Sequence, residues 1–254
     1  MKYVKRMTVF FTALLLMLCV QAIPAQAATS LVKLTAGKTY TAYDFTRDGR
    51  KDKFYYKSSN YQADVYIGEK KVAQITAGKA VNPQLYYWKV DKTNTYVLVK
   101  GASTGGWWYD AYQYKSGKLK WVYSFSAGDL TDATLQKASG KYLYMKYSSQ
   151  RYGTFSLRHG KGITVKFKYK TSNGKISLAS RTGTIVSGQT FKALNSFTTS
   201  NACGKSNTKG TYVQKGKTVK VKGAYLDSSG RVWYKIYCGG KSGWFVDSDS
   251  KLLK

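Results

Sequence analysis

One stretch of the chain spaces oxygen-bearing side chains as a loop that binds a hard cation does. Asp44, Thr46, Asp48, Arg50 and Asp52 occupy positions 1, 3, 5, 7 and 9 of this loop, and a glycine stands at position 6, where a sharp turn is needed. Carboxylates, a hydroxyl and the backbone carbonyl at position 7 are the donors that calcium prefers. The spacing predicts a calcium site. The alternative is an Asp-Gly turn whose carboxylates accept hydrogen bonds from backbone amides.

This loop resembles the Asp-x-Thr-x-Asp-Gly-x-x-Asp loops of secreted β-repeat proteins, including integrin-like repeats. It differs from an EF-hand because it lacks the glutamate at position 12 and because strands, not helices, are expected beside it. The resemblance implies a β-repeat domain with calcium bound between its strands.

A second group with chemical potential combines aromatic rings with a carboxylate. Trp107, Trp108, Tyr109 and Asp110 are consecutive, and strand alternation places Trp108 and Asp110 on the same face. Aromatic rings stack on sugar rings, and a carboxylate accepts hydrogen bonds from their hydroxyl groups. Trp108 and Asp110 are therefore candidate ligand-binding residues. The alternative is that these rings pack in a core.

Residues for catalysis are scarce. The chain has one histidine, His159, and one glutamate, Glu69, and its aspartates outside the calcium-like loop are scattered. Nucleophilic and acid-base mechanisms need such groups to converge. We therefore predict a protein that is not an enzyme, with no catalytic residues.

The N-terminus has the features of an export signal. Lys2, Lys5 and Arg6 precede the apolar run from Met7 to Val20, and Ala25-Gln26-Ala27 supplies the small residues that a signal peptidase requires. The apolar run is shorter than the ~20 residues that span a bilayer. We predict a signal peptide over residues 1–27, a secreted protein, and no transmembrane segment in the mature chain.

Charge is the next constraint on function. Lys and Arg number 42 against 12 Asp and Glu, which gives a net charge of +30. Such an excess favours a polyanionic partner, such as a phosphate-rich cell-wall polymer. The lysines alternate along predicted strands, as in Lys166 to Lys170 and Lys217 to Lys222. A merely solvated surface is the alternative, and no motif for sequence-specific nucleic-acid recognition is present.

The elements that must position these residues are β-strands. Strand-forming residues dominate, with 23 Tyr and only 2 Pro in the chain, and helical periodicity is confined to Asp129–Ala138. The fold class is all-β. The predicted strands are Lys53–Lys57, Ala63–Ile67, Lys71–Ile75, Leu85–Val90, Tyr96–Lys100, Trp107–Tyr114, Lys118–Phe125, Tyr142–Tyr147, Gly153–Arg158 and Ile163–Tyr169. They repeat at intervals of about 45 residues, which predicts an antiparallel β-repeat domain over 28–180, either propeller-like or a sandwich.

The last quarter of the chain has a distinct order of elements. A Lys-Gly pair opens an alternating strand at Lys209, a Trp-Tyr strand follows at Val232–Ile236, and a Gly-Trp-Phe strand follows at Gly243–Asp247. This order resembles a bacterial SH3-like domain and implies a small β-barrel over residues 181–254 that associates with cell-wall polymers. The aromatic residues that the resemblance makes candidates for ligand binding are Tyr212, Trp233, Tyr234 and Trp244.

Two cysteines remain after removal of the signal peptide, Cys203 and Cys238. An even number of cysteines in an exported chain predicts one disulfide between them. The preferred function is a secreted, non-enzymatic protein that associates with the cell wall or another anionic extracellular polymer through its SH3-like module. The alternative is a secreted cell-wall-active enzyme or enzyme inhibitor that this module targets.

Overall fold

The computed structural model describes residues 30–78, 81–103, 106–127, 130, 132–148, 163–186, 189–205, 208–246 and 253. The predicted signal peptide and the strand expected at Gly153–Arg158 lie outside these residues. All the regular elements in the described ranges are β-strands, numbered β1 to β19. No helix there is long and apolar enough to cross a membrane.

Three antiparallel sheets make up the fold. The first is a three-stranded meander of β2 (Phe54–Ser59), β3 (Gln62–Ile67) and β4 (Lys70–Thr76). The second has the order β1-β5-β6-β7-β8, and its strands are β1 (Leu31–Lys33), β5 (Gln84–Lys89), β6 (Thr95–Ser103), β7 (Gly106–Lys115) and β8 (Lys118–Phe125).

The third sheet contains eleven strands in the order β16-β15-β19-β18-β17-β13-β11-β10-β9, with β12 added to β11 and β14 added to β17. Its strands are β9 (Asp132–Ser139), β10 (Tyr142–Ser148), β11 (Thr164–Ser172), β12 (Lys175–Leu178), β13 (Thr182–Ile185), β14 (Gln189–Lys192), β15 (Phe197–Ser200), β16 (Lys209–Val213), β17 (Thr218–Leu226), β18 (Val232–Cys238) and β19 (Lys241–Val246).

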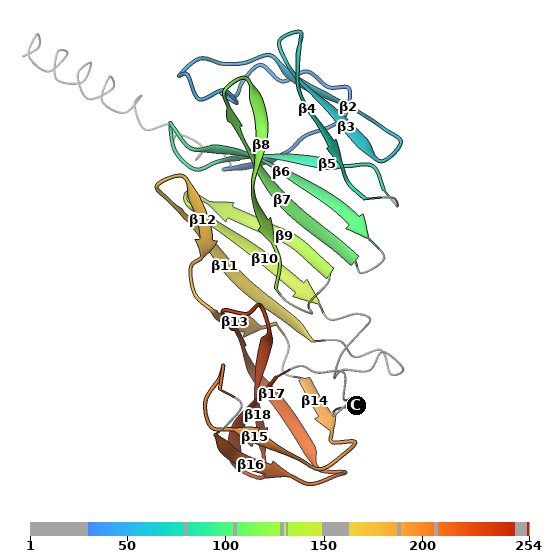
Figure 1. Cartoon of the computed structure of the whole chain (residues 1–254), viewed down its shortest axis with the longest axis vertical. Coiled ribbons are helices and arrows are strands. Elements are labelled where there is room, and N and C mark those ends of the chain that lie inside the picture. The colour runs from blue at the N-terminus through green and yellow to red at the C-terminus, as the bar shows by residue number, and fades with distance from the viewer. Residues whose placement is uncertain are drawn as a thin grey trace, which may run out of the picture.

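The second sheet is the middle layer of the N-terminal region. Successive residues of β6 are buried on opposite faces, since Val97 and Val99 belong to one hydrophobic core while Tyr96 and Leu98 belong to another. The first core lies against β2–β4, and the second continues into β9–β11 and the C-terminal strands. Figure 1 shows these layers following one another along the long axis of the molecule.

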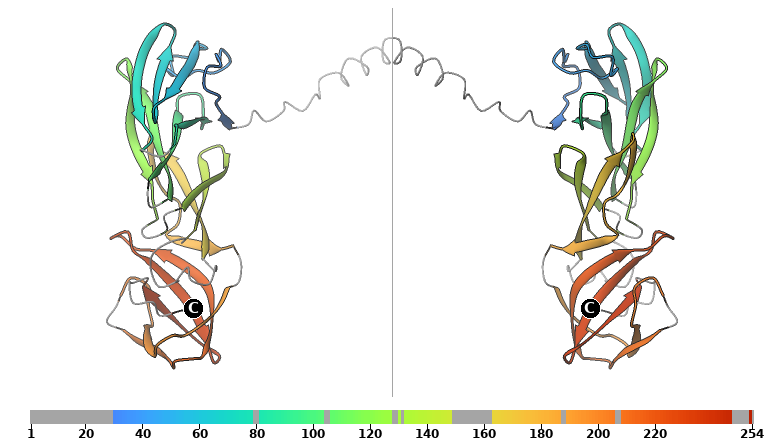
Figure 2. Two further views of the ribbon diagram at one scale, coloured as in Figure 1. Left: turned by 90° about the vertical axis from the view of Figure 1, so that its right-hand side faces the viewer. Right: turned by 90° about the vertical axis from the view of Figure 1, so that its left-hand side faces the viewer.

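The third sheet continues through the predicted domain boundary at residues 180 and 181. Strand β11 pairs with β13 at Val165 and Ile185, and β13 pairs with β17 at Thr182 and Tyr225. Both views in Figure 2 show β13–β19, in orange and red, at the far end of the molecule from β2–β4. The predicted β-repeat region (28–180) and the predicted SH3-like region (181–254) therefore share backbone hydrogen bonds and one hydrophobic core.

The all-β fold class is confirmed, and the described sheets are layered, without closure of a propeller or a barrel. One local prediction is wrong. The segment expected to form a helical turn at Asp129–Ala138 contains β9, whose residues from Asp132 pair with β10. Burial of Ala133 and hydrogen bonding to β10 outweigh a weak local helix propensity.

Candidate functional site

The calcium-like loop folds as a hydrogen-bonded turn. Asp52 Oδ2 accepts the backbone N–H groups of Phe45 (2.6 Å) and Thr46 (2.8 Å). The two oxygens of Asp44 accept the N–H groups of Arg47 and Gly49. Gly49, at loop position 6, has a φ of 88°, a left-handed conformation that glycine adopts without strain.

The carboxylates of this loop all accept hydrogen bonds from its backbone. Asp48 Oδ1 accepts the N–H of Arg50 at 2.8 Å, so all three carboxylates are engaged with the backbone of the loop. In the described ranges, no three acidic, histidine or cysteine side chains gather into a group that could hold a metal ion. The geometry favours the hydrogen-bonded turn over the predicted calcium site, which stays a prediction.

The predicted disulfide is not formed, because the two cysteines lie at opposite ends of β17. Both are free, half-buried thiols. Gly204, next to Cys203, packs against Asp227, just beyond one end of the strand. Cys238 follows Tyr237, which pairs with Lys220 near the other end. At about 3.3 Å per residue these positions are roughly 20 Å apart, whereas a disulfide needs Cα atoms within about 7 Å.

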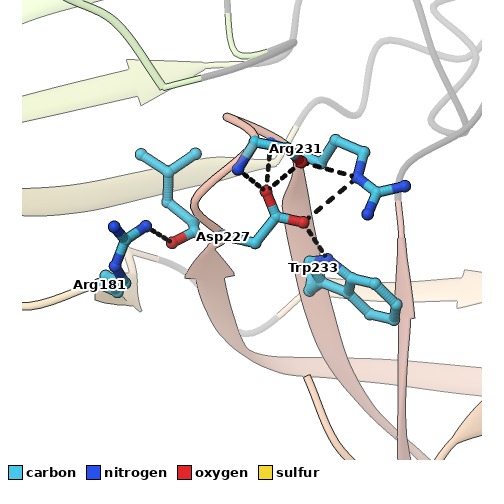
Figure 3. A network of polar contacts seen from close by, with 6 residues as sticks. Arg181, Asp227, Arg231 and Trp233 are labelled. Atoms are coloured by element: carbon cyan, nitrogen blue, oxygen red, sulfur yellow. Dashed lines mark hydrogen bonds and ion pairs between the residues drawn. The ribbon is translucent and has the colours of Figure 1, made fainter. Parts of the chain in front are cut away.

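The predictions that Tyr234 and Trp233 bind a ligand are wrong, because both side chains are buried. Tyr234 is 0% exposed and packs in the core, where its ring lies 5.6 Å from that of Phe245. Trp233 faces the other side of β18 and is 1% exposed. Its indole N–H donates to Asp227 Oδ2 at 2.9 Å, and the guanidinium of Arg231 lies 6.0 Å from its ring (Figure 3).

Asp227 organises this turn between β17 and β18. Its carboxylate accepts hydrogen bonds from the backbone N–H groups of Ser229 and Arg231, both at 2.9 Å, and from the hydroxyl of Ser229. Burial by itself raises the pKa of Asp227, but the hydrogen bonds from Ser229 and Trp233 more than reverse this and hold the pKa well below its usual range. The Asp227 carboxylate is therefore a structural residue, because its hydrogen bonds hold Ser229, Arg231 and Trp233 in place around this turn.

The other predicted aromatics in this region reach the surface. Tyr212 is 64% exposed on β16. Trp244 is half-buried on β19, pairs with Lys235 across the ladder, and contacts Tyr225 edge-on at 6.4 Å. These two residues stay candidates for ligand contact.

No family model, curated protein or solved structure matches this chain. The resemblances to SH3-like domains and to integrin-like repeats therefore stay predictions.

The most distinctive surface is the outer face of β9–β12. Alternate residues of β10 and β11, such as Leu143, Met145, Val165 and Phe167, are buried, so the residues between them point outward. We call this surface the lysine–tyrosine face. It consists of Lys137, Lys141, Tyr142, Tyr144, Lys146, Lys166, Lys168, Lys170 and Lys175.

Ammonium groups on this face lie over tyrosine rings. Lys168 Nζ is 3.7 Å from the ring centroid of Tyr142 and 5.5 Å from that of Tyr144. Lys137 Nζ lies 5.1 Å from Tyr144, and Lys141 Nζ lies 5.7 Å from Tyr142. These are cation–π distances, and such contacts hold an ammonium group in place while leaving it charged.

These strands carry a single acidic residue, Asp132, at the first position of β9. From Ala133 to Leu226 the sequence contains no aspartate or glutamate. The two salt bridges between described residues, Lys71 with Asp64 and Arg231 with Asp227, lie elsewhere. Alternating lysines predict outward positive charge, and this acid-free interval is the further sequence signal that could have located the face.

The predicted pair Trp108 and Asp110 does share a face, on β7. Asp110 Oδ1 accepts a hydrogen bond from the hydroxyl of Ser124 on β8. Burial raises the pKa of Asp110, and the hydrogen bonds from Ser124 and Trp121 partly oppose this. Among the described residues, Ser124 is hydrogen-bonded to Trp121 and Asp110.

Proposed function

We propose that this protein is a secreted, non-enzymatic binder of anionic extracellular polymers, such as the phosphate-rich polymers of a bacterial cell wall, and that the lysine–tyrosine face is its principal contact surface. Export rests on the predicted signal peptide. An SH3-like barrel at residues 181–254 that assists wall association is part of the same proposal, supported by the antiparallel order of β17, β18 and β19.

One observation carries the proposal. Lys146 on β10 and Lys166 on β11 are direct cross-strand partners on the outer face. Like charges in that arrangement are destabilising. A polymer with regularly spaced negative charges would remove this repulsion, so the arrangement is suited to a bound polyanion.

The geometry of the face supports an extended ligand. Lys166, Lys168 and Lys170 alternate along β11, so their side chains leave the strand at intervals of about 7 Å on one face. Lys137 and Lys146 extend the charge across β9 and β10. The positive charge therefore extends over several neighbouring strands, which suits a polymer with many negative charges better than a single small anion.

Binding to purified cell wall, before and after removal of its phosphodiester-linked polymers, tests the proposal. The variant Lys146→Gln/Lys166→Gln/Lys168→Gln should bind intact wall more weakly. Its binding should also depend less on salt, because the slope of log K against log salt falls by about 0.7 for each phosphate that a lysine no longer neutralises.

A matched control removes three exposed lysines elsewhere, as Lys51→Gln/Lys53→Gln/Lys89→Gln. Equal losses in both variants would mean that net charge, and not this face, determines binding. Unchanged binding after removal of the anionic polymers, or turnover of wall fragments by the protein, would contradict the proposed function.

A further inference from the structure

A row of polar and aromatic side chains lies on the middle sheet, away from the lysine–tyrosine face. Trp108, Asp110 and Tyr112 alternate on β7 and therefore point to the same side. On β8, Ser124 pairs with Asp110 and Trp121 pairs with Tyr112. We call these five residues the aromatic row.

A β-bulge brings Trp121 into this row. The β7–β8 register shifts between Ala111 and Tyr112, so that Ala111 pairs with Tyr123 but Tyr112 pairs with Trp121. Regular alternation would have placed Val122 opposite Tyr112 and turned Trp121 to the other face. Bulges commonly redirect a side chain in this way at functional positions.

The backbone of β6 accommodates the ring of Trp108. Gly101 pairs with Trp108, and a Cβ atom at position 101 would lie only 2.2 Å from Cζ2 of the indole. The ring therefore lies against the backbone of β6, in the space that the missing side chain leaves. Trp108 is half-buried there.

Hydrogen bonds fix the orientation of the second indole. Trp121 Nε1 donates to Ser124 Oγ at 3.3 Å, and Ser124 in turn donates to Asp110 Oδ1. The ring of Trp121 is nevertheless 57% exposed, the largest exposure of any described tryptophan. The Asp110 carboxylate, which is half-buried, lies next to this exposed indole.

We propose that the aromatic row is a second binding site, whose ligand is an uncharged sugar ring of a glycan. The exposed, oriented indole of Trp121 provides a flat apolar face that matches the C–H face of a pyranose, and the neighbouring Asp110 carboxylate is suited to accept hydrogen bonds from sugar hydroxyls. The row carries a carboxylate and no lysine, so it disfavours the polyanions that suit the lysine–tyrosine face. This inference does not depend on the proposed function.

The test is a titration of the full chain with cellotetraose and with the tetramer of β-1,4-linked N-acetylglucosamine, followed by tryptophan fluorescence. We expect saturable binding of at least one tetramer, with a Kd that does not change between low and high salt because the ligand is neutral. Trp121→Ala and Asp110→Asn should each weaken that binding about tenfold or more, as expected for a central aromatic contact and its polar partner.

Trp107→Ala is the matched control. Trp107 is 37% exposed, lies on the opposite face of β7, and has Lys100 Nζ 3.8 Å from its ring. Its loss should leave tetramer binding unchanged. The proposal is overturned if neither tetramer binds, if Trp107→Ala and Trp121→Ala have equal effects, or if binding falls with salt. Because Trp121 is exposed, its variant should keep the wild-type melting temperature, which separates loss of binding from loss of fold.

Discussion

Lys146 and Lys166 face each other directly across the β10–β11 ladder, with outward-pointing side chains. The pair lies beside Tyr144 and Lys168, which are also direct partners. A folded protein that retains such a pair forgoes some stability at this position, which is the usual relationship between a binding surface and the rest of a fold.

Replacing one lysine of this pair should stabilise the protein. We expect Lys166→Gln to raise the free energy of unfolding by about 0.2–1 kcal/mol, because it removes a like-charge cross-strand pair. Urea denaturation at low salt measures this change, and the gain should shrink at high salt as the repulsion is screened. A destabilised variant would show that Lys166 makes a favourable contact within the protein.

The turn at Asp227 should be sensitive to substitution. Asp227→Ala leaves the indole N–H of Trp233 and the amides of Ser229 and Arg231 without their acceptor. We expect a loss of about 2–3 kcal/mol in the free energy of unfolding, because a buried, charged hydrogen-bond acceptor is removed. Asp227→Asn, which retains one carbonyl acceptor, should lose less. Equal stability of the alanine variant and the wild type would contradict the anchoring role.

The same residue predicts a pH dependence. The folded pKa of Asp227 is depressed below the value of about 3.9 for an unfolded aspartate, so its contribution is fully present above that pH. As the pH falls below about 4, the unfolded state binds a proton first and the contribution is progressively lost. The stability difference between wild type and Asp227→Asn should therefore narrow in acid, as measured by urea titration at a series of pH values.

Calcium should have little effect on the loop at Asp44–Asp52. Because Asp44 and Asp52 already accept backbone amides, added calcium should leave the melting temperature unchanged. Asp52→Ala should lower stability with or without calcium, by about 1–3 kcal/mol, because two backbone donors lose their acceptor. A calcium-dependent rise in melting temperature that Asp52→Ala abolishes would instead support the chelating site.

The cysteines should behave as separate thiols. Alkylation of the unfolded, unreduced protein followed by peptide mass spectrometry should find both Cys203 and Cys238 modified. The wild-type protein should then have the same melting temperature with and without reductant, since no cross-link is present to be broken. Recovery of a Cys203–Cys238 linked peptide would contradict the placement of the two residues at opposite ends of β17.

Local patterns were sufficient to predict most strands between residues 53 and 169. Alternation in Tyr142–Tyr147 marks β10 plainly, because its odd-numbered residues fill the core and its even-numbered residues reach solvent. The same reasoning misassigned β9, where the pairing partner and not the local sequence selects the conformation. Local sequence also could not show that Trp233 and Tyr234, both predicted to bind a ligand, would be buried.

The sequence by itself determined the fold class, the positive charge and the alternation that places lysines outward, because these follow from composition and from the two-residue period of a strand. The tertiary structure decided which residues meet. Cross-strand register sets Lys146 against Lys166, and a single bulge sets Trp121 beside Asp110. Register also keeps Cys203 away from Cys238. These relationships depend on hydrogen bonds between segments distant in the chain, which no local pattern encodes.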